Sequence, residues 1–137
     1  LSFATVFVCP SIYEPLGIVN LEAMACEAAV VATATGGIPE VVVDPDWGGG
    51  VDAPASTGPA TGWLVPIEQV DDGTGTPVDP DRFVDDLGRT LSAAVSDTAE
   101  ARRRGEAGRR RAVEQFGWDT IGARTEKVYR EVLTEGT

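Results

Sequence analysis

Short apolar runs rich in β-branched residues alternate along this sequence with segments of helical periodicity. The apolar runs predict strands over residues 5–9, 30–33 and 63–65. The periodic segments predict helices over residues 16–28, 38–43, 80–96, 99–115 and 118–133. Strands that alternate with helices pair in parallel, and three of them form about half of a doubly wound sheet. We therefore expect an α/β fold: about half of a doubly wound, Rossmann-like parallel sheet domain, with flanking helices and a helical C-terminal third.

Two glutamates, Glu14 and Glu22, flank the start of the first predicted helix. Pro15 suits the first turn of a helix, because its missing N–H would be unpaired there. The N–H groups that follow point outward without partners, and the helix dipole adds partial positive charge, so this helix start attracts anions such as phosphate. The residues concerned are Leu16, Gly17, Ile18 and Val19. Gly17 also lacks the Cβ that would keep a phosphate at a distance.

Glu22 lies inside the same predicted helix, among mostly apolar neighbours. Burying a carboxylate without a partner costs several kcal/mol, so Glu22 should face a cleft and accept hydrogen bonds, for instance from ribose hydroxyls. Glu14 precedes the helix and can reach the space in front of it. From spacing alone, a simpler interpretation is equally open: Glu14 is a surface loop acid and Glu22 a partly solvated residue on the helix face.

Three stretches of the sequence are similar to motifs of a known family: FVCPSIYEPLGIVNLEAMA at residues 7–25, VVATATGGIPEVV at 30–42 and TGWLVP at 61–66. They resemble the C-terminal, donor-binding half of retaining GT-B glycosyltransferases of family 4. Within that family, the chain is most similar to bacterial glycogen synthases of the actinobacterial type. The resemblance runs from about residue 4 to the end of the chain.

The resemblance assigns roles to individual residues. Glu14 matches the motif glutamate that lies against the hexose hydroxyls and assists departure of the nucleotide, so it is the expected catalytic residue. Glu22 matches the glutamate that binds the ribose. The expected phosphate-binding amides belong to Leu16, Gly17, Ile18 and Val19, and a nearby turn that approaches the donor contains Gly36 and Gly37. Preorganised N–H donors suit this chemistry because negative charge grows on the departing diphosphate.

The resemblance implies a retaining hexosyltransferase that passes glucose from a nucleoside diphosphate glucose to an α-1,4-glucan or a small glucosyl acceptor in glycogen synthesis. ADP-glucose is the favoured donor over UDP-glucose, and no cofactor or metal is expected. Two alternatives stay open. One is a nucleotide-sugar-binding module without catalysis, and the other is a family 4 enzyme with a different sugar or acceptor, or with a sibling chemistry such as nucleotide-sugar epimerisation.

Two further chemistries fit the sequence poorly. A glycosidase needs two carboxylates that flank one scissile bond, whereas the helix carries Glu22 away from the place where Glu14 would meet a sugar. A pyridoxal-phosphate-dependent phosphorylase needs a lysine at the site. The sole lysine of this chain, Lys127, falls in the last predicted helix, far from the site in sequence.

Composition excludes several other classes. The net charge is −11, and all eleven Lys and Arg residues lie from Arg82 onward, so no basic face accompanies the site and nucleic acid is not an expected partner. The chain contains no histidine, which disfavours a metal site, and its two cysteines, Cys9 and Cys26, are expected to be buried thiols. It contains no long apolar span, so we expect no membrane partner and a cytoplasmic location.

The same charge distribution indicates an incomplete enzyme. Members of the family supply an Arg and a Lys to the donor phosphates from earlier parts of this domain, and the acceptor groove from an N-terminal domain. No Lys or Arg precedes Arg82 here. The resemblance therefore implies that residues 1–137 are part of a C-terminal nucleotide-sugar-binding domain, namely the second half of its doubly wound, Rossmann-like sheet, and that they are inactive alone. The sheet edge at the N-terminal strand would then be open, and we expect the chain to hide it in a homodimer.

The C-terminal third contains two arginine clusters, residues 102–104 and 109–111, which interleave with glutamates at helical spacing. This pattern is typical of a solvated helix face with weak ion pairs; a patch that docks a polyanion or glycogen is the less favoured alternative. Two stretches rich in Gly, Pro and Asp, residues 44–59 and 71–80, are expected to be surface loops; a role as lids over the acceptor is the alternative.

Overall fold

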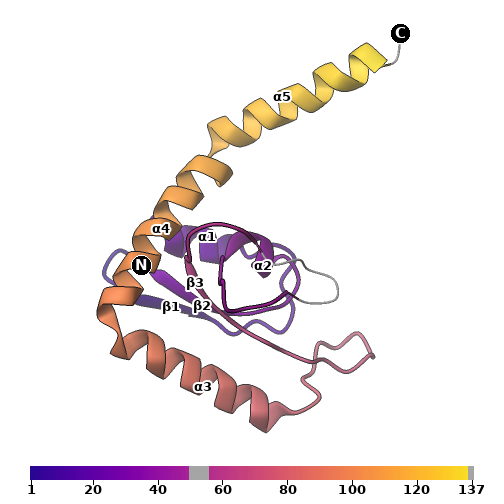
Figure 1. Ribbon diagram of the computed structural model, residues 1–137. Helices are drawn as coiled ribbons and strands as arrows, with labels where there is room; N and C mark the ends of the chain where they lie inside the picture. The colour runs from indigo at the N-terminus through magenta and orange to yellow at the C-terminus, as the bar shows by residue number, and fades with distance from the viewer. Residues whose placement is uncertain (50–55, 136–137) are drawn as a thin grey trace.

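A computed structural model describes residues 1–49 and 56–135 of the chain (Figure 1). Residues 50–55, inside the first predicted loop, lie outside the described residues. The elements in chain order are β1 (Val6–Cys9), α1 (Ile18–Ala25), β2 (Ala29–Thr33), α2 (Ile38–Val41), β3 (Gly62–Val65), α3 (Pro80–Ser96), α4 (Thr98–Phe116) and α5 (Trp118–Glu135). All eight elements were predicted in this order, and the strand and long-helix bounds agree to within two residues.

The three strands form one parallel sheet in the order β1-β2-β3. Phe7 lies opposite Val30, and Ala32 lies opposite Leu64. The predicted α/β fold with three parallel strands and a helical C-terminal part is thus confirmed. Every residue of β2 is buried, as expected for the central strand of a parallel sheet that is covered on both faces. Among the described residues, β1 pairs only with β2, so its other edge is open.

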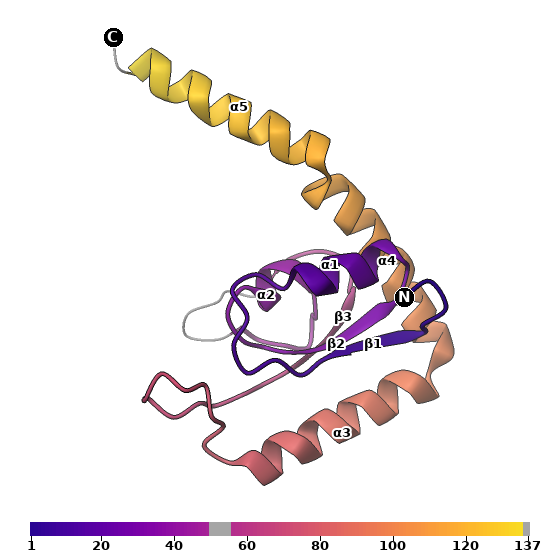
Figure 2. The ribbon, with the colours of Figure 1, turned by 180° about the vertical axis from the view of Figure 1, so that it is seen from behind.

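Helices cover both faces of the sheet (Figures 1 and 2). One face carries α3, whose Phe83, Leu87 and Leu91 pack against a cluster that includes Val31 and Val65. The other face carries α1, α2 and α4, and its larger core includes Met24, Val30, Ile38 and Val42. A Cβ on Gly105 of α4 would stand 2.1 Å from the carbonyl oxygen of Glu27, so a residue without a side chain lets α4 cross the α1–β2 turn closely.

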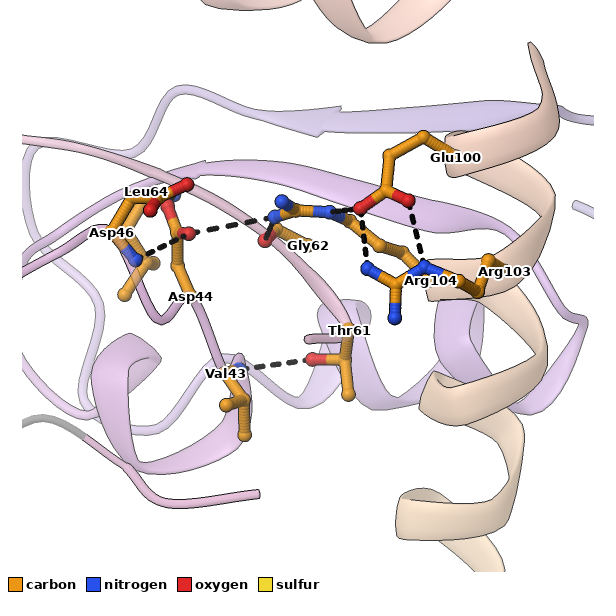
Figure 3. A network of polar contacts seen from close by, with 9 residues as sticks. All are labelled: Val43, Asp44, Asp46, Thr61, Gly62, Leu64, Glu100, Arg103 and Arg104. Atoms are coloured by element: carbon orange, nitrogen blue, oxygen red, sulfur yellow. Dashed lines mark hydrogen bonds and ion pairs between the residues drawn. The ribbon is translucent and has the colours of Figure 1, made fainter. Parts of the chain in front are cut away.

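The arginine clusters of α4 are not a uniformly solvated face: that interpretation is wrong for Arg104, whereas Arg102 and Arg103 are exposed and form ion pairs at helical spacing. The side chain of Arg104 is 8% exposed and that of Asp44 6% exposed; they form an ion pair of 3.4 Å (Figure 3). Arg104 also donates to the carbonyl oxygen of Gly62 and stacks over Trp63 at 4.2 Å from the ring centroid. Asp44 in turn accepts the N–H of Leu64 at 2.8 Å. This network ties α4 to β3 and to the segment after α2.

Two more arginines of α4 bind the carboxyl ends of other helices. Arg111 donates to the carbonyl oxygens of Val41 (2.8 Å) and Glu40 (2.7 Å), where α2 ends. Arg109 donates to the carbonyl oxygen of Ala25, where α1 ends. The last carbonyls of a helix lack partners and carry partial negative charge, so a guanidinium there is stabilising. Partial burial lowers the pKa of Arg111.

The last helix, α5, extends away from the rest of the molecule (Figures 1 and 2). Its exposed apolar side chains include Val128, Tyr129, Val132 and Leu133. In the described part of the chain, no helix is both long enough and apolar enough to span a bilayer.

The second predicted loop is not irregular throughout, because residues 68–78 fold back as a hairpin in which Gln69 and Pro77 form an antiparallel bridge.

Candidate functional site

The segment between β1 and α1 ends in a turn that Glu14 closes itself. Its Oε1 accepts the N–H of Gly17 at 3.0 Å. Gly17 has φ +89°, a left-handed conformation that glycine adopts without strain, and it is the N-cap of α1. The helix therefore begins at Ile18, two residues later than predicted. The helix bounds 16–28 were wrong at both ends, because the pattern of apolar residues continues through the turns on either side of the helix.

Two helical N–H groups at the start of α1 have no partner in the described chain. The N–H of Asn20 bonds the carbonyl oxygen of Gly17 at 2.9 Å, whereas those of Ile18 and Val19 have no acceptor in residues 1–49 and 56–135. The N–H of Leu16, just before the turn, also has none there. The Gly17 amide, in contrast, is already bonded to Glu14. A helix start with unpaired N–H groups is suited to binding an anion.

The turn between β2 and α2 packs directly against this segment. The N–H of Gly37 donates to the carbonyl oxygen of Glu14 at 3.1 Å. A Cβ on Gly36 would stand 1.9 Å from that oxygen, and one on Gly37 would stand 2.4 Å from the carbonyl oxygen of Pro15. Both glycines are therefore required by the close approach of two backbones. The turn also lies where parallel strands end at their carboxyl edge, which is where such sheets bind ligands.

Glu22 lies one turn along α1 from Ile18, on the same side of the helix. Both residues line a groove of about 700 Å³ between α1 and the junction of α4 and α5. The expectation that Glu22 faces a cleft agrees with this position, and the described chain provides it with no hydrogen-bond or ion-pair partner. The other residues that line the groove are mostly apolar: Leu16, Leu21, Ala25, Ala112, Val113, Phe116, Gly117, Trp118, Asp119, Thr120 and Ile121.

The structure thus brings most of the predicted residues together at one end of the sheet. Glu14, Gly17, Gly36 and Gly37 meet through backbone contacts, with Leu16, Ile18 and Val19 at the adjoining helix start. Glu22 lies farther along α1, beside the groove. The described residues contain no group of three or more Cys, Asp or Glu side chains that could hold a metal ion.

Sequence reasoning missed a buried polar side chain directly behind this turn. Asn20 is fully buried, and neither of its side-chain polar atoms has a partner within the described ranges. A Cβ on Gly17 would stand 2.7 Å from its Nδ2. Thr33, the last residue of β2, is also buried with an unpaired hydroxyl there. A signal for Asn20 exists in the sequence: it is a polar residue four positions before Met24 on the apolar face of the helix.

Comparison with known proteins gives a consistent result. The sequence model of the family described as "Glycosyl transferases group 1" matches residues 1–111. The chain is 48% identical over 132 residues to alpha-maltose-1-phosphate synthase of Mycobacterium tuberculosis, covering 96% of this chain and 28% of that protein. It is 35% identical to the MMP alpha-(1->4)-mannosyltransferase of Mycolicibacterium hassiacum, covering 97% of this chain and 26% of that protein.

A third relative and a solved structure extend the comparison. The chain is 30% identical over 122 residues to glycogen synthase of Mycobacterium tuberculosis, covering 89% of this chain and 23% of that protein. The structure of sucrose-phosphate synthase from Thermosynechococcus elongatus superposes with a TM-score of 0.68 at 32% identity, covering 96% of this chain and 26% of that one. The chain therefore spans about a quarter of the length of the proteins that it matches.

Proposed function

Because the chain belongs to the group 1 glycosyl transferases, we propose that it is the donor-binding part of a retaining GT-B glucosyltransferase. In this proposal residues 1–137 form part of a C-terminal nucleotide-sugar-binding domain, and an upstream domain supplies the acceptor groove. The donor is a nucleoside diphosphate glucose, with ADP-glucose favoured over UDP-glucose. The acceptor is an α-1,4-glucan or a small glucosyl acceptor, as the names of the maltose-1-phosphate and glycogen synthase relatives suggest.

The observation that supports this proposal most strongly is the helix start beside Glu14. The unpaired N–H groups of Ile18 and Val19 are fixed donors that can bind the diphosphate. As the bond between the anomeric carbon and the phosphate oxygen breaks, negative charge grows on that oxygen, and these donors stabilise it without having to reorganise. The half-buried carboxylate of Glu14 stands next to them and can stabilise positive charge that develops on the sugar.

Retention of configuration follows if the acceptor attacks the face that the nucleotide leaves. The acceptor hydroxyl oxygen then forms the new bond to the anomeric carbon, and its proton passes to the departing phosphate oxygen. Glu22 binds the ribose hydroxyls from the groove side of α1 in this proposal, and the Gly36–Gly37 turn borders the sugar. No metal or organic cofactor takes part in any step.

The experiment is a transfer assay with the full-length enzyme that contains this segment. Purified protein is supplied with ADP-glucose or UDP-glucose, and with glycogen or glucose 1-phosphate as acceptor. We expect transfer from ADP-glucose with retained configuration, unaffected by EDTA. Absence of transfer, together with donor binding by calorimetry, would instead support a binding module.

A different sugar is the second candidate, and the similarity to a mannosyltransferase favours it. GDP-mannose is therefore included as a third donor in the same assay. Faster transfer of mannose than of glucose would replace the glucosyl assignment while leaving the proposed roles of Glu14 and Glu22 in place.

A further inference from the structure

The hairpin that follows β3 contacts the segment that carries Glu14. Val70 N–H donates to the carbonyl oxygen of Thr76 at 2.9 Å, and Val78 N–H donates to that of Glu68 at 2.8 Å. At its tip, Asp72 accepts the N–H of Thr74 at 2.9 Å and the hydroxyl of Thr74 at 2.6 Å. The hairpin thus has its own internal hydrogen bonds. Figure 2 shows it projecting beyond the end of the sheet.

A single side chain, Gln69, joins the hairpin to the segment before α1. Its Nε2 donates to the carbonyl oxygen of Ile12 at 2.6 Å and to that of Gly75 at 2.8 Å. Both acceptors are carbonyl oxygens, so the –NH2 end of the amide must face them and both of its protons are used. Ile12 lies two residues before Glu14. The contact therefore acts on the backbone that places the Glu14 carboxylate.

Gly75 makes this contact possible. Its φ is +77°, and a Cβ there would stand 2.9 Å from the Ile12 carbonyl oxygen and 3.2 Å from Gln69 Nε2. Gly73, in the same hairpin, has φ +74° but no atom within 4 Å of its Cβ position. The two glycines share the left-handed backbone, and only Gly75 is required by the approach to Ile12.

The segment is also held by the Gly36–Gly37 turn, through the bond from Gly37 N–H to the Glu14 carbonyl oxygen. Gln69 and Gly37 thus hold positions 12 and 14 from two different loops. Ile12 and Tyr13 are themselves exposed, so their side chains contribute little to holding the segment in place.

We propose that Gln69 is a positioning residue for the transfer reaction: by bonding the Ile12 carbonyl, it fixes the segment that presents Glu14 to the donor's hexose. This inference rests on the proposed function for its catalytic consequence. The restraint itself is a property of the folded chain and can be measured without a donor. Displacing a catalytic group by about 1 Å lowers turnover by up to about a hundredfold, so loss of the restraint should lower kcat more than it raises the KM for the donor.

The first test measures, by NMR or mass spectrometry, the hydrogen exchange of the Gly17 and Gly37 amides, which bond the carboxylate and the carbonyl oxygen of Glu14. Gln69→Glu keeps the size of the side chain but removes its donors, whereas Gln69→Lys keeps a donor. Exchange of these two amides should become about tenfold faster in Gln69→Glu, which is the effect of losing the bond to the Ile12 carbonyl oxygen, and less so in Gln69→Lys. Equal exchange in the wild type and Gln69→Glu would overturn the proposed restraint.

The second test measures kcat and donor KM in the full-length enzyme. Gln69→Glu and Gly75→Ala should each lower kcat about tenfold or more, with donor KM changed less than about twofold, and Gln69→Lys should restore part of the loss. Gly73→Ala is the matched control, since it introduces the same backbone strain in open space, and it should leave kcat near that of the wild type.

The outcomes separate this inference from the proposed function. A wild-type enzyme that transfers no glucosyl unit refutes the proposed function, and with it the catalytic role of Gln69, while the exchange test still decides on the restraint. An active wild type whose Gln69→Glu variant has an unchanged kcat overturns the positioning role alone. Equal losses of kcat in Gly73→Ala and Gly75→Ala would overturn the positioning role too, because backbone strain in the hairpin would then explain both losses.

Discussion

Glu14 accepts hydrogen bonds through two different groups. Its carboxylate accepts the Gly17 N–H and thereby closes the turn before α1, and its carbonyl oxygen accepts the Gly37 N–H. A carboxylate at a helix N-terminus is stabilising in its own right, because it faces the positive end of the dipole. The structural role and the proposed catalytic role of the side chain therefore need to be separated by experiment.

Glu14→Gln and Glu14→Ala should separate the two roles. Gln keeps an oxygen that can accept the Gly17 N–H, so we expect stability close to that of the wild type. Ala removes the acceptor, so unfolding in urea should show a loss of about 1 kcal/mol. In the full-length enzyme both variants should lower kcat about a hundredfold, because the charge beside the sugar is lost in both. A Glu14→Gln enzyme with wild-type kcat would remove Glu14 from the catalytic residues.

At the scale of single residues, the sequence allowed the proximity of several candidate site residues to be predicted. Glu14 and the Gly36–Gly37 turn lie near each other, as the resemblance implied, and both glycines lack the Cβ that would prevent the two backbones from touching. Asn20 was missed although it is a polar residue on the apolar face of the first helix, and Gln69 was not predicted because nothing local marks it. The role of Gln69 depends on a contact with Ile12, 57 positions away in the sequence. Which residues bind donor stays a prediction.

Among the elements, α4 carries most of the polar contacts that join one part of the fold to another. The sequence predicted its bounds well, because a 19-residue helix has many turns over which the period can be recognised. The burial of Arg104, in contrast to the exposed Arg102 and Arg103, could not be predicted from the sequence alone. Their difference depends on which part of the helix faces β3, which is decided by tertiary packing. The short helix α1 was predicted less well because turns with similar apolar residues flank it.

Arg104→Met should destabilise the fold strongly. The substitution leaves the buried Asp44 without its cation, and breaking a buried pair in this way costs about 3 to 5 kcal/mol. The free energy of unfolding in urea measures the loss. Arg103→Met is the control, since Arg103 is exposed and its pair with Glu100 contributes less than about 1 kcal/mol. Adding Asp44→Asn to Arg104→Met should recover part of the lost stability. Equal losses of stability in Arg104→Met and Arg103→Met would contradict a buried, stabilising Arg104.

The start of α4 should also make stability depend on pH. Hydrogen bonds from Arg103 and then Arg104 lower the pKa of Glu100 to about 2, from 4.5. A carboxyl group whose pKa is lower in the folded state stabilises the fold fully above its unfolded pKa. We therefore expect this contribution to disappear as the pH falls from about 4.5 towards 2. Glu100→Gln should flatten the pH dependence of the unfolding free energy in that window, whereas Glu106→Gln, at an exposed pair, should change it little.

On the scale of the whole molecule, the described residues leave an unpaired strand edge and an apolar helix surface open. One is the free edge of β1, which pairs only with β2 among the described residues. The other is α5, with the exposed Tyr129 and Leu133, together with Trp118, which is 89% exposed at the mouth of the groove. Exposed strand edges and large apolar patches both favour association with another chain. The open edge of β1 was expected from the sequence, since it follows from the order of the strands and from the interpretation of the chain as part of a larger domain.

The isolated 137-residue chain should therefore associate with itself, and β1 is the surface we expect it to use. The Ala29 N–H bonds the Thr5 carbonyl oxygen, so by alternation along β1 the N–H of Val8 points to the open edge. Val8→Pro would remove that outward donor while leaving the bonds to β2 intact. Sedimentation velocity over a range of concentrations should show dimers for the wild type and for a chain ending at residue 117, but monomers for Val8→Pro with unchanged circular dichroism. If the chain ending at residue 117 is monomeric instead, the association depends on α5; a monomeric wild type at high concentration would refute association by either surface.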